Sequence, residues 1–328
     1  MRSVTYSYNF TLPITSWCIN RCAYCAFRTD APTLLSLDEC EELGKKAFEK
    51  GVIEALIMTG EGIDRHPVMK KQLEDWGFNS YASYTAEVCK TFLDIGLLPH
   101  TNIGTLEEKE LEILKPYNVS MGMMVETTSE KATKIAHSAA PTKKPSLRLS
   151  SLREAGKLRI PFTTGILIGI GESYEDRIKT LESIGEIHSQ FGHVQEVILQ
   201  PLNPQEETPM ANWEKPNDEK IEELIPSLKK IMPDVHIQIP PNLVDNLFSL
   251  IEAGADDLGG IAPEPDHINP NKDWPNLSSL ESELKDREVE LRLRMPVYDE
   301  YIKKSWCPEP TMKALNNMLS KNSSPVSI

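Results

Sequence analysis

Long apolar runs are missing from this sequence. No stretch reaches the roughly 18 residues that a membrane-spanning helix needs. The N-terminal segment MRSVTYSYNFTLPITSWC also lacks the basic residues and following apolar run that mark a secretion signal. We therefore expect a cytoplasmic protein that has no membrane partner.

Basic residues are scarce relative to acidic ones. The 328 residues contain 35 Lys and Arg against 49 Asp and Glu, which gives a formal net charge of -14. Because a charge of this sign repels phosphate backbones, we expect no nucleic acid partner and no polyanionic substrate. The hydrophobic fraction of 40% is that of an ordinary globular chain with a full core.

Cysteine is too sparse for a scaffold held by disulfides, with six residues in the whole chain. Its distribution is nevertheless uneven. Cys18, Cys22 and Cys25 lie together in the segment SWCINRCAYCAF, whereas the other three are scattered and show no ligand spacing. The uneven spacing makes the first three the candidates for chemistry.

Short apolar or β-branched runs alternate with amphipathic stretches along the chain, which indicates an α/β fold. The runs predict eight strands, at Asn9–Ile14, Glu54–Met58, Leu97–Asn102, Ser120–Glu126, Phe162–Ile168, Val194–Gln200, His236–Ile239 and Asp257–Ile261. Eight such units favour a closed (βα)8 TIM-like barrel with a short C-terminal extension, and an open doubly wound sheet is the alternative. We place the barrel in residues 1–303 and expect the tail, 304–328, to be disordered in part.

Helices are expected between these strands, and three of them carry a candidate N-cap. Ser36, Ser173 and Asn217 each precede two acidic residues, which suit the positive end of a helix.

The triplet C-x3-C-x2-C follows the first predicted strand, so three thiolates can converge from one loop. Thiolates at this spacing suit an iron-sulfur cluster or zinc. Zinc needs a fourth ligand, and the nearest histidine in the sequence is His66. A set of three instead leaves one iron of a 4Fe-4S cluster open to a ligand that is not protein.

The triplet, with Tyr24 before its last cysteine and with Gly60-Glu61 at the end of the second strand, resembles the radical S-adenosylmethionine (SAM) superfamily. This resemblance implies that the cysteines hold a 4Fe-4S cluster whose open iron binds SAM. It also implies a radical SAM type of barrel, with further cofactor contacts at strand ends. By position these are Gly60, Glu61, Glu126, Arg148, Gly169, Glu172 and Leu199.

Within the superfamily, longer segments are similar to the first radical subunit of the deazaflavin synthases. They include LKPYNVSMGMMVE, FGHVQEVILQPLNPQEETPM and PPNLVDNLFSLIEAGADDLGGIAP. The resemblance implies a carbon-nitrogen lyase that converts a 4-hydroxybenzyl adduct of ribityliminouracil to a deazaflavin with loss of ammonia, through a 5'-deoxyadenosyl radical. It further implies a partner radical SAM subunit that supplies this small-molecule substrate, and an electron donor such as ferredoxin or flavodoxin.

Polar residues near the strand ends are the candidates for substrate contacts. They are Asn102, Gln200, Asn203, Asp257 and Asn269, while Asp257 and His100 are candidates for a catalytic base. Two other functions stay open. One is another radical SAM reaction, of the menaquinone-futalosine or biotin-synthase-like group, and the other is a non-catalytic iron-sulfur or zinc protein.

Overall fold

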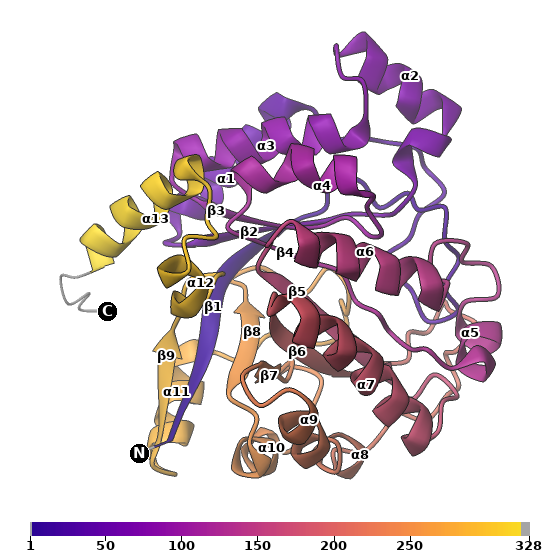
Figure 1. Ribbon diagram of the computed structural model, residues 1–328, viewed down its shortest axis with the longest axis vertical. Helices are drawn as coiled ribbons and strands as arrows, with labels where there is room; N and C mark the ends of the chain where they lie inside the picture. The colour runs from indigo at the N-terminus through magenta and orange to yellow at the C-terminus, as the bar shows by residue number, and fades with distance from the viewer. Residues whose placement is uncertain (1, 323–328) are drawn as a thin grey trace.

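The computed structural model describes residues 2–322. Its centre is a barrel of eight parallel strands, closed by pairing between β1 and β2, with a ninth strand added outside (Figure 1). The strands are β1 Arg2–Leu12, β2 Glu54–Met58, β3 Leu98–Asn102, β4 Ser120–Gly122, β5 Phe162–Ile168, β6 Val194–Pro201, β7 His236–Gln238, β8 Asp257–Ile261 and β9 Val289–Leu293. The predicted barrel is confirmed and the open sheet is wrong.

Helices cover the outside of the barrel (Figure 1). The α-helices are α1 Leu37–Glu49, α2 Pro67–Asp75, α3 Tyr81–Ile95, α4 Glu108–Leu114, α5 Glu130–Ala136, α6 Pro145–Lys157, α7 Tyr174–Phe191, α8 Glu219–Glu222, α9 Ile225–Ile231, α10 Leu247–Ala253, α11 Leu277–Lys285, α12 Asp299–Lys303 and α13 Glu309–Asn322, with 3-10 turns at Ile63–Arg65 and Lys115–Tyr117. The largest group of buried apolar side chains lies between barrel and helices. None of the helices within residues 2–322 is long and apolar enough to cross a bilayer.

Two of the three predicted caps are confirmed. Ser36 and Ser173 each form a capping box with the acidic residue three positions later. The prediction for Asn217 is wrong, because α8 begins after Asp218. The segment up to Ile231 forms two helices, α8 and α9, and Pro226, which lacks an N–H, lies at the start of the second.

The fourth strand is shorter than predicted, since β4 ends at Gly122, and the backbone of Glu126 leaves the extended region. Its φ of 70° lies in the left-handed region, which non-glycine residues rarely adopt. Glu126 still pairs with Ile166 through an isolated bridge. The carboxyl end of the fourth strand is thus bent where a functional residue was predicted.

The strand β9 was not predicted. It pairs in parallel with residues 2–6 of β1, at the amino end of the barrel. The alternation in VELRLRM, residues 289–295, is the signal that could have identified it.

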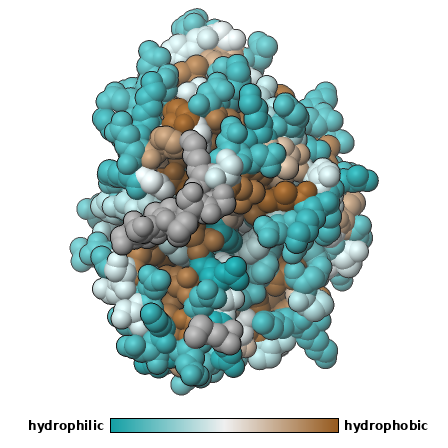
Figure 2. Space-filling view, turned by 90° about the vertical axis from the view of Figure 1, so that its left-hand side faces the viewer, coloured by the Kyte–Doolittle hydropathy of each residue, from teal (hydrophilic) through white to brown (hydrophobic). Residues whose placement is uncertain are grey.

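The C-terminal region, expected to be disordered in part, forms α13 as far as Asn322, and the remaining residues lie outside those described. Figure 2, which looks at the left-hand side of Figure 1, shows hydrophilic side chains over most of this face and hydrophobic ones in patches toward its middle. Leu293 of β9 and Leu319 of α13 are among the exposed hydrophobic residues.

Candidate active site

A cavity of about 320 Å³ occupies the inside of the barrel. At the carboxyl ends of the strands it is lined by Cys18, Cys22 and Cys25. At the other end it reaches Glu54, the first residue of β2, and Arg294, which follows β9. One cavity therefore connects the cysteine loop with the amino ends of the strands.

The cysteine loop joins β1 to α1 and is held by backbone hydrogen bonds from several segments. Ile19 N donates to Glu61 O at 2.9 Å, Arg21 N donates to Ala139 O at 2.9 Å, and Ala23 N donates to Ala136 O at 2.8 Å. The three thiols are free and only partly buried. The loop is thus fixed to the barrel while its sulfurs stay open to the cavity.

Three thiols on one loop are a donor set that suits an iron-sulfur cluster. One zinc ion needs its ligands to meet at one point, about 2.3 Å from each sulfur. Within residues 2–322 no three Cys, His, Asp or Glu side chains meet in this way. A cubane cluster takes one cysteine per iron, so its sulfurs lie apart. Glu61 N donates to Cys18 Sγ at 3.1 Å, the kind of contact that stabilises a thiolate.

Gly60 packs directly against the cysteine loop. A Cβ built on it would lie 1.7 Å from Trp17 O and 2.8 Å from Cys18 Cβ. Because the first of these is a backbone atom, any side chain at position 60 must displace the loop.

We expect Gly60→Ala to lower the iron content after reconstitution several-fold, because the first cysteine moves with the loop. Iron and sulfide analysis measures this. Gly77→Ala is the control, since its Cβ meets nothing within 4 Å and only the positive φ of 86° is strained. Equal iron content in the two variants would contradict the close packing.

Four charged side chains lie beside the cysteines, and all four line the cavity. Arg148 Nη2 lies 2.5 Å from Glu61 Oε1, and Lys143 Nζ lies 2.5 Å from Glu126 Oε1 and 4.0 Å from Glu61 Oε1. Burial opposes ionisation of both carboxyls, but the two cations hold their pKa values below the ordinary one. The four side chains, Glu61, Glu126, Lys143 and Arg148, are therefore ionised, and their two negative charges balance their two positive ones.

Lys143 was not predicted from the sequence as a site residue. It lies in PTKKP before α6, where no motif distinguishes it from Lys144.

Arg148 is 1% exposed, and its Nε has no hydrogen-bond partner among the described residues. A buried guanidinium with a free donor next to a cavity suits a ligand carboxylate.

The predicted residues Gly169 and Glu172 do not line the cavity. The Glu172 carboxylate accepts from Gly169 N at 2.7 Å and Ile170 N at 2.8 Å, and it pairs with Arg177 Nε at 2.7 Å. Its hydrogen-bonding capacity is used inside the turn between β5 and α7. The structure thus gives Glu172 a role in bracing that turn.

Leu199, Asn203 and Asp257 do not line the cavity either. The Leu199 side chain is fully buried in the outer core, whereas its neighbours Ile198 and Gln200 face the cavity, as alternation along a strand requires. Asn203 donates to Asn269 Oδ1 at 3.1 Å, and of the two residues only Asn269 lines the cavity. The predicted residues that do line the cavity include Asn102, Gln200, Asn269 and His100.

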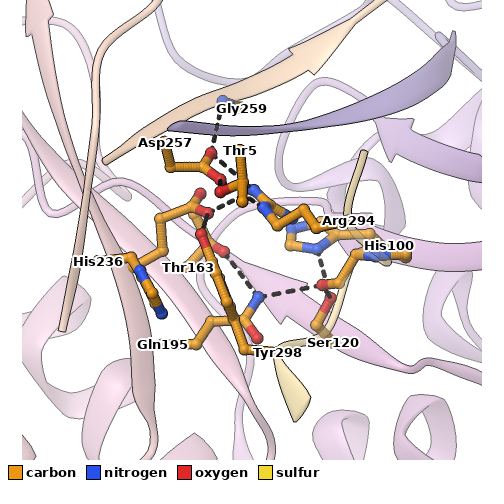
Figure 3. Close-up of polar contacts among 12 residues, drawn as sticks. Thr5, His100, Ser120, Thr163, Gln195, His236, Asp257, Gly259, Arg294 and Tyr298 are labelled. Carbon is orange, nitrogen blue, oxygen red and sulfur yellow. Dashed lines mark hydrogen bonds and ion pairs between the residues drawn. The ribbon is translucent and has the colours of Figure 1, made fainter. Parts of the chain in front are cut away.

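Asp257 is held in an ion pair at the amino end of the barrel (Figure 3). Its Oδ2 lies 2.5 Å from Arg294 Nε and its Oδ1 lies 2.8 Å from Arg294 Nη2, while Thr5 also donates to it. Because Asp257 is fully buried with these partners, the role of base predicted for it has no support in its position. The prediction overlooked Arg294, which follows the unpredicted strand β9.

Arg294 also binds a second carboxylate. Its Nη2 lies 2.6 Å from Glu196 Oε2, which accepts from Tyr298 Oη at 3.0 Å as well. Burial, with the negative charges of Asp257 and Glu54, raises the pKa of Glu196 to about 8 despite Arg294. Arg294 thus binds two buried acids, and it lowers the pKa of Asp257, whereas burial keeps the pKa of Glu196 raised.

We expect the free energy of unfolding to fall as pH rises from about 5 to 8. In this range the folded chain keeps a proton on Glu196 that the unfolded chain has lost, so the slope is negative and at most about 1.4 kcal/mol per pH unit. Urea unfolding at several pH values measures it. Glu196→Gln should flatten the slope, and Glu186→Gln on the outer helix α7 is the control. An unchanged slope in Glu196→Gln would contradict this assignment.

Comparison with known proteins gives the same picture. The family model of the radical SAM superfamily matches residues 12–184, which is more than half of the chain. A 7,8-didemethyl-8-hydroxy-5-deazariboflavin synthase of Methanococcoides burtonii is 46% identical over 325 residues, 97% of each chain. A protein of the same name from Archaeoglobus fulgidus is 43% identical over 98% of each chain.

Solved structures agree in fold. The FeFe-hydrogenase maturase HydG of Carboxydothermus hydrogenoformans superposes with a TM-score of 0.71 at 20% identity, covering 95% of this chain and 72% of that one. Methylornithine synthase superposes with a TM-score of 0.66 at 16% identity, covering 88% and 84%. The cysteine loop, the barrel and the similarity over nearly the whole chain agree: the chain belongs to the radical SAM superfamily and, within it, to the family of the 7,8-didemethyl-8-hydroxy-5-deazariboflavin synthases.

Proposed function

We propose that this chain binds a 4Fe-4S cluster through Cys18, Cys22 and Cys25. We propose further that it uses SAM in the step that forms 7,8-didemethyl-8-hydroxy-5-deazariboflavin, the product after which its relatives are named. The observation that carries the proposal is that three thiols open onto the same cavity as four buried charges. When bound, cluster and SAM supply a carbon-centred radical that abstracts hydrogen from the substrate. The chain supplies the ligands, the charges and the enclosed space.

The charged side chains beside the cysteines suit the methionyl end of SAM. Arg148 has a free Nε for a carboxylate, and the carboxylate of Glu126 suits an ammonium group or ribose hydroxyls. The backbone at Gly60 and Glu61 lies against the first cysteine. Opposite charges placed in pairs allow a zwitterion to bind without leaving a buried charge alone.

For the substrate we propose the 4-hydroxybenzyl adduct of ribityliminouracil, made by a partner radical SAM subunit. The overall change is ring closure with loss of ammonia and removal of two hydrogens, for which one SAM per turnover is the oxidant. Asn102, Gln200 and Asn269 line the cavity near or beyond the carboxyl ends of β3, β6 and β8, on the side of the cysteines, and are placed to hold the rings. Enclosure by the barrel keeps water from the radical. A ferredoxin or flavodoxin as electron donor and a cytoplasmic location remain part of the proposal.

Anaerobic reconstitution with iron and sulfide, followed by dithionite and SAM, tests the function. With the adduct present we expect 5'-deoxyadenosine and a fluorescent deazaflavin in equal amounts. A protein that binds iron but forms no 5'-deoxyadenosine would be the non-catalytic alternative. Formation of 5'-deoxyadenosine with a futalosine-type substrate, and of no deazaflavin with the adduct, would indicate the other radical SAM reaction.

A further inference from the structure

The end of the cavity farthest from the cysteines is polar. Five side chains from four strands line it, and each is less than one-tenth exposed. We call this set the deep end; it consists of Asn9, Glu54, His100, Gln195 and Glu196. Glu54 begins β2 and Gly60 lies just beyond its end, so at about 3.3 Å per residue the deep end is on the order of 15 to 20 Å below the cysteine loop.

A bulge in β6 brings two of these side chains to the same face. The pairing register between β5 and β6 shifts between Phe162, opposite Val194, and Thr163, opposite Glu196. Gln195 is the extra residue, and both it and Glu196 line the cavity. Bulges of this kind redirect side chains at functional positions.

His100 presents a hydrogen-bond acceptor to the cavity. Ser120 Oγ lies 2.5 Å from Pro296 O, a group that only accepts, so the hydroxyl hydrogen is used there. His100 Nδ1, 2.7 Å from the same Oγ, must therefore be the donor of that pair (Figure 3). Burial also lowers the pKa of His100 to about 3, so the ring is neutral and Nε2 carries a lone pair.

Two amide side chains of the deep end keep an acceptor oxygen that no protein group within residues 2–322 uses. Asn9 Oδ1 and Gln195 Oε1 are buried and have no hydrogen-bond partner among the described residues. The Gln195 amide donates to Thr163 and Pro296 instead (Figure 3). Glu54 adds a buried carboxyl group.

The one cation here is already engaged. Arg294 donates to Asp257 and Glu196 through Nε and Nη2 and to Met295 O through Nη1, so four of its five N–H groups point to protein acceptors. The deep end therefore offers oxygens and a nitrogen that accept, next to three carboxyl groups and one guanidinium. Such a surface suits a neutral ligand with several hydroxyl donors and opposes a phosphate.

We propose that the deep end binds the ribityl chain of the substrate, in its unphosphorylated form, with His100 Nε2 and Glu54 accepting hydrogen bonds from chain hydroxyls. This inference rests on the proposed function, because the product after which the relatives are named, a deazariboflavin, carries that ribityl chain. The reacting rings of the substrate then lie toward the cysteines, and its unreactive ribityl chain lies away from the site where the radical forms. His100 acts as a positioning residue and not as a base.

Binding of the fluorescent deazaflavin product to the cluster-loaded protein tests the inference. Three ligands are compared, carrying ribityl, ribityl 5'-phosphate or methyl on the same ring nitrogen. For the wild type we expect ribityl to bind about 30- to 100-fold more tightly than methyl, as two or three hydrogen bonds would give, and more tightly than the phosphate.

The variants identify the side chains. Glu54→Gln and His100→Leu should each reduce the ribityl preference about tenfold and leave the dissociation constant of the methyl analogue unchanged. His193→Leu is the matched control, since His193 is buried like His100 but donates from Nε2 to Leu152 O at 2.9 Å, outside the cavity. Circular dichroism melting shows whether each variant is folded.

The outcomes separate the two proposals. A wild type that forms the deazaflavin but binds ribityl and methyl ligands equally would overturn the deep-end assignment alone. Variants that weaken the binding of the ribityl and methyl ligands to the same extent would also overturn it. A wild type that forms no deazaflavin and binds none of the three ligands would refute the proposed function and this inference together.

Discussion

Replacing Cys22 with alanine is expected to remove both the cluster and all turnover. Each thiolate holds one iron, and loss of one of three leaves the cluster with two protein ligands. The loss of activity should exceed the roughly 10- to 100-fold that removal of an outer-shell partner costs. Iron analysis, visible absorption and 5'-deoxyadenosine formation after anaerobic reconstitution measure it.

The chain contains its own controls for this experiment. Cys40, Cys89 and Cys307 are buried and do not line the cavity. Cys307→Ala should keep the full iron content and turnover. If Cys22→Ala retains 5'-deoxyadenosine formation, or if Cys307→Ala loses it, the ligand assignment is wrong.

Arg148→Met is expected to weaken SAM binding about 10- to 100-fold, since it removes a charged hydrogen-bond donor from the site. It also leaves Glu61 in a buried position with Lys143 at 4.0 Å as the remaining cation, so a loss of about 3–5 kcal/mol of stability is expected. Equilibrium dialysis with SAM on cluster-loaded protein measures the first effect, and urea unfolding measures the second.

Two further variants separate binding from stability. Arg148→Lys keeps the charge but not the planar fork, so it should recover stability more than SAM affinity. Arg153→Met changes the same residue type on the same helix, where Arg153 donates to Gln190 and does not line the cavity. An unchanged SAM dissociation constant in Arg148→Met, at full iron content, would show that Arg148 only braces Glu61.

The motif residues and several strands could be predicted because their signals are local, although the longest strand, β1, begins at Arg2 and not at the predicted Asn9. Cysteine spacing places Cys18, Cys22 and Cys25 on one loop, and apolar runs define β2, β5 and β8 with the observed bounds. The partners of polar side chains were predicted less well. Asp257 looks like a strand-end ligand in the sequence, but Arg294, from a distant segment, binds it in the structure. Glu172 is bound by Arg177, only five residues later, which the motif did not reveal.

The sequence by itself determined the barrel, the cysteine loop and the family, because periodicity and motif spacing act over a few residues. Only the tertiary structure decided which polar groups face the cavity, since the bulge at Gln195, the bend at Glu126 and the pairing of β9 with β1 arise from contacts between strands. Arg294 is the clearest case. It lies 37 residues beyond Asp257 in the chain yet forms its ion pair, because the folded barrel brings the two side chains together in a space that excludes water.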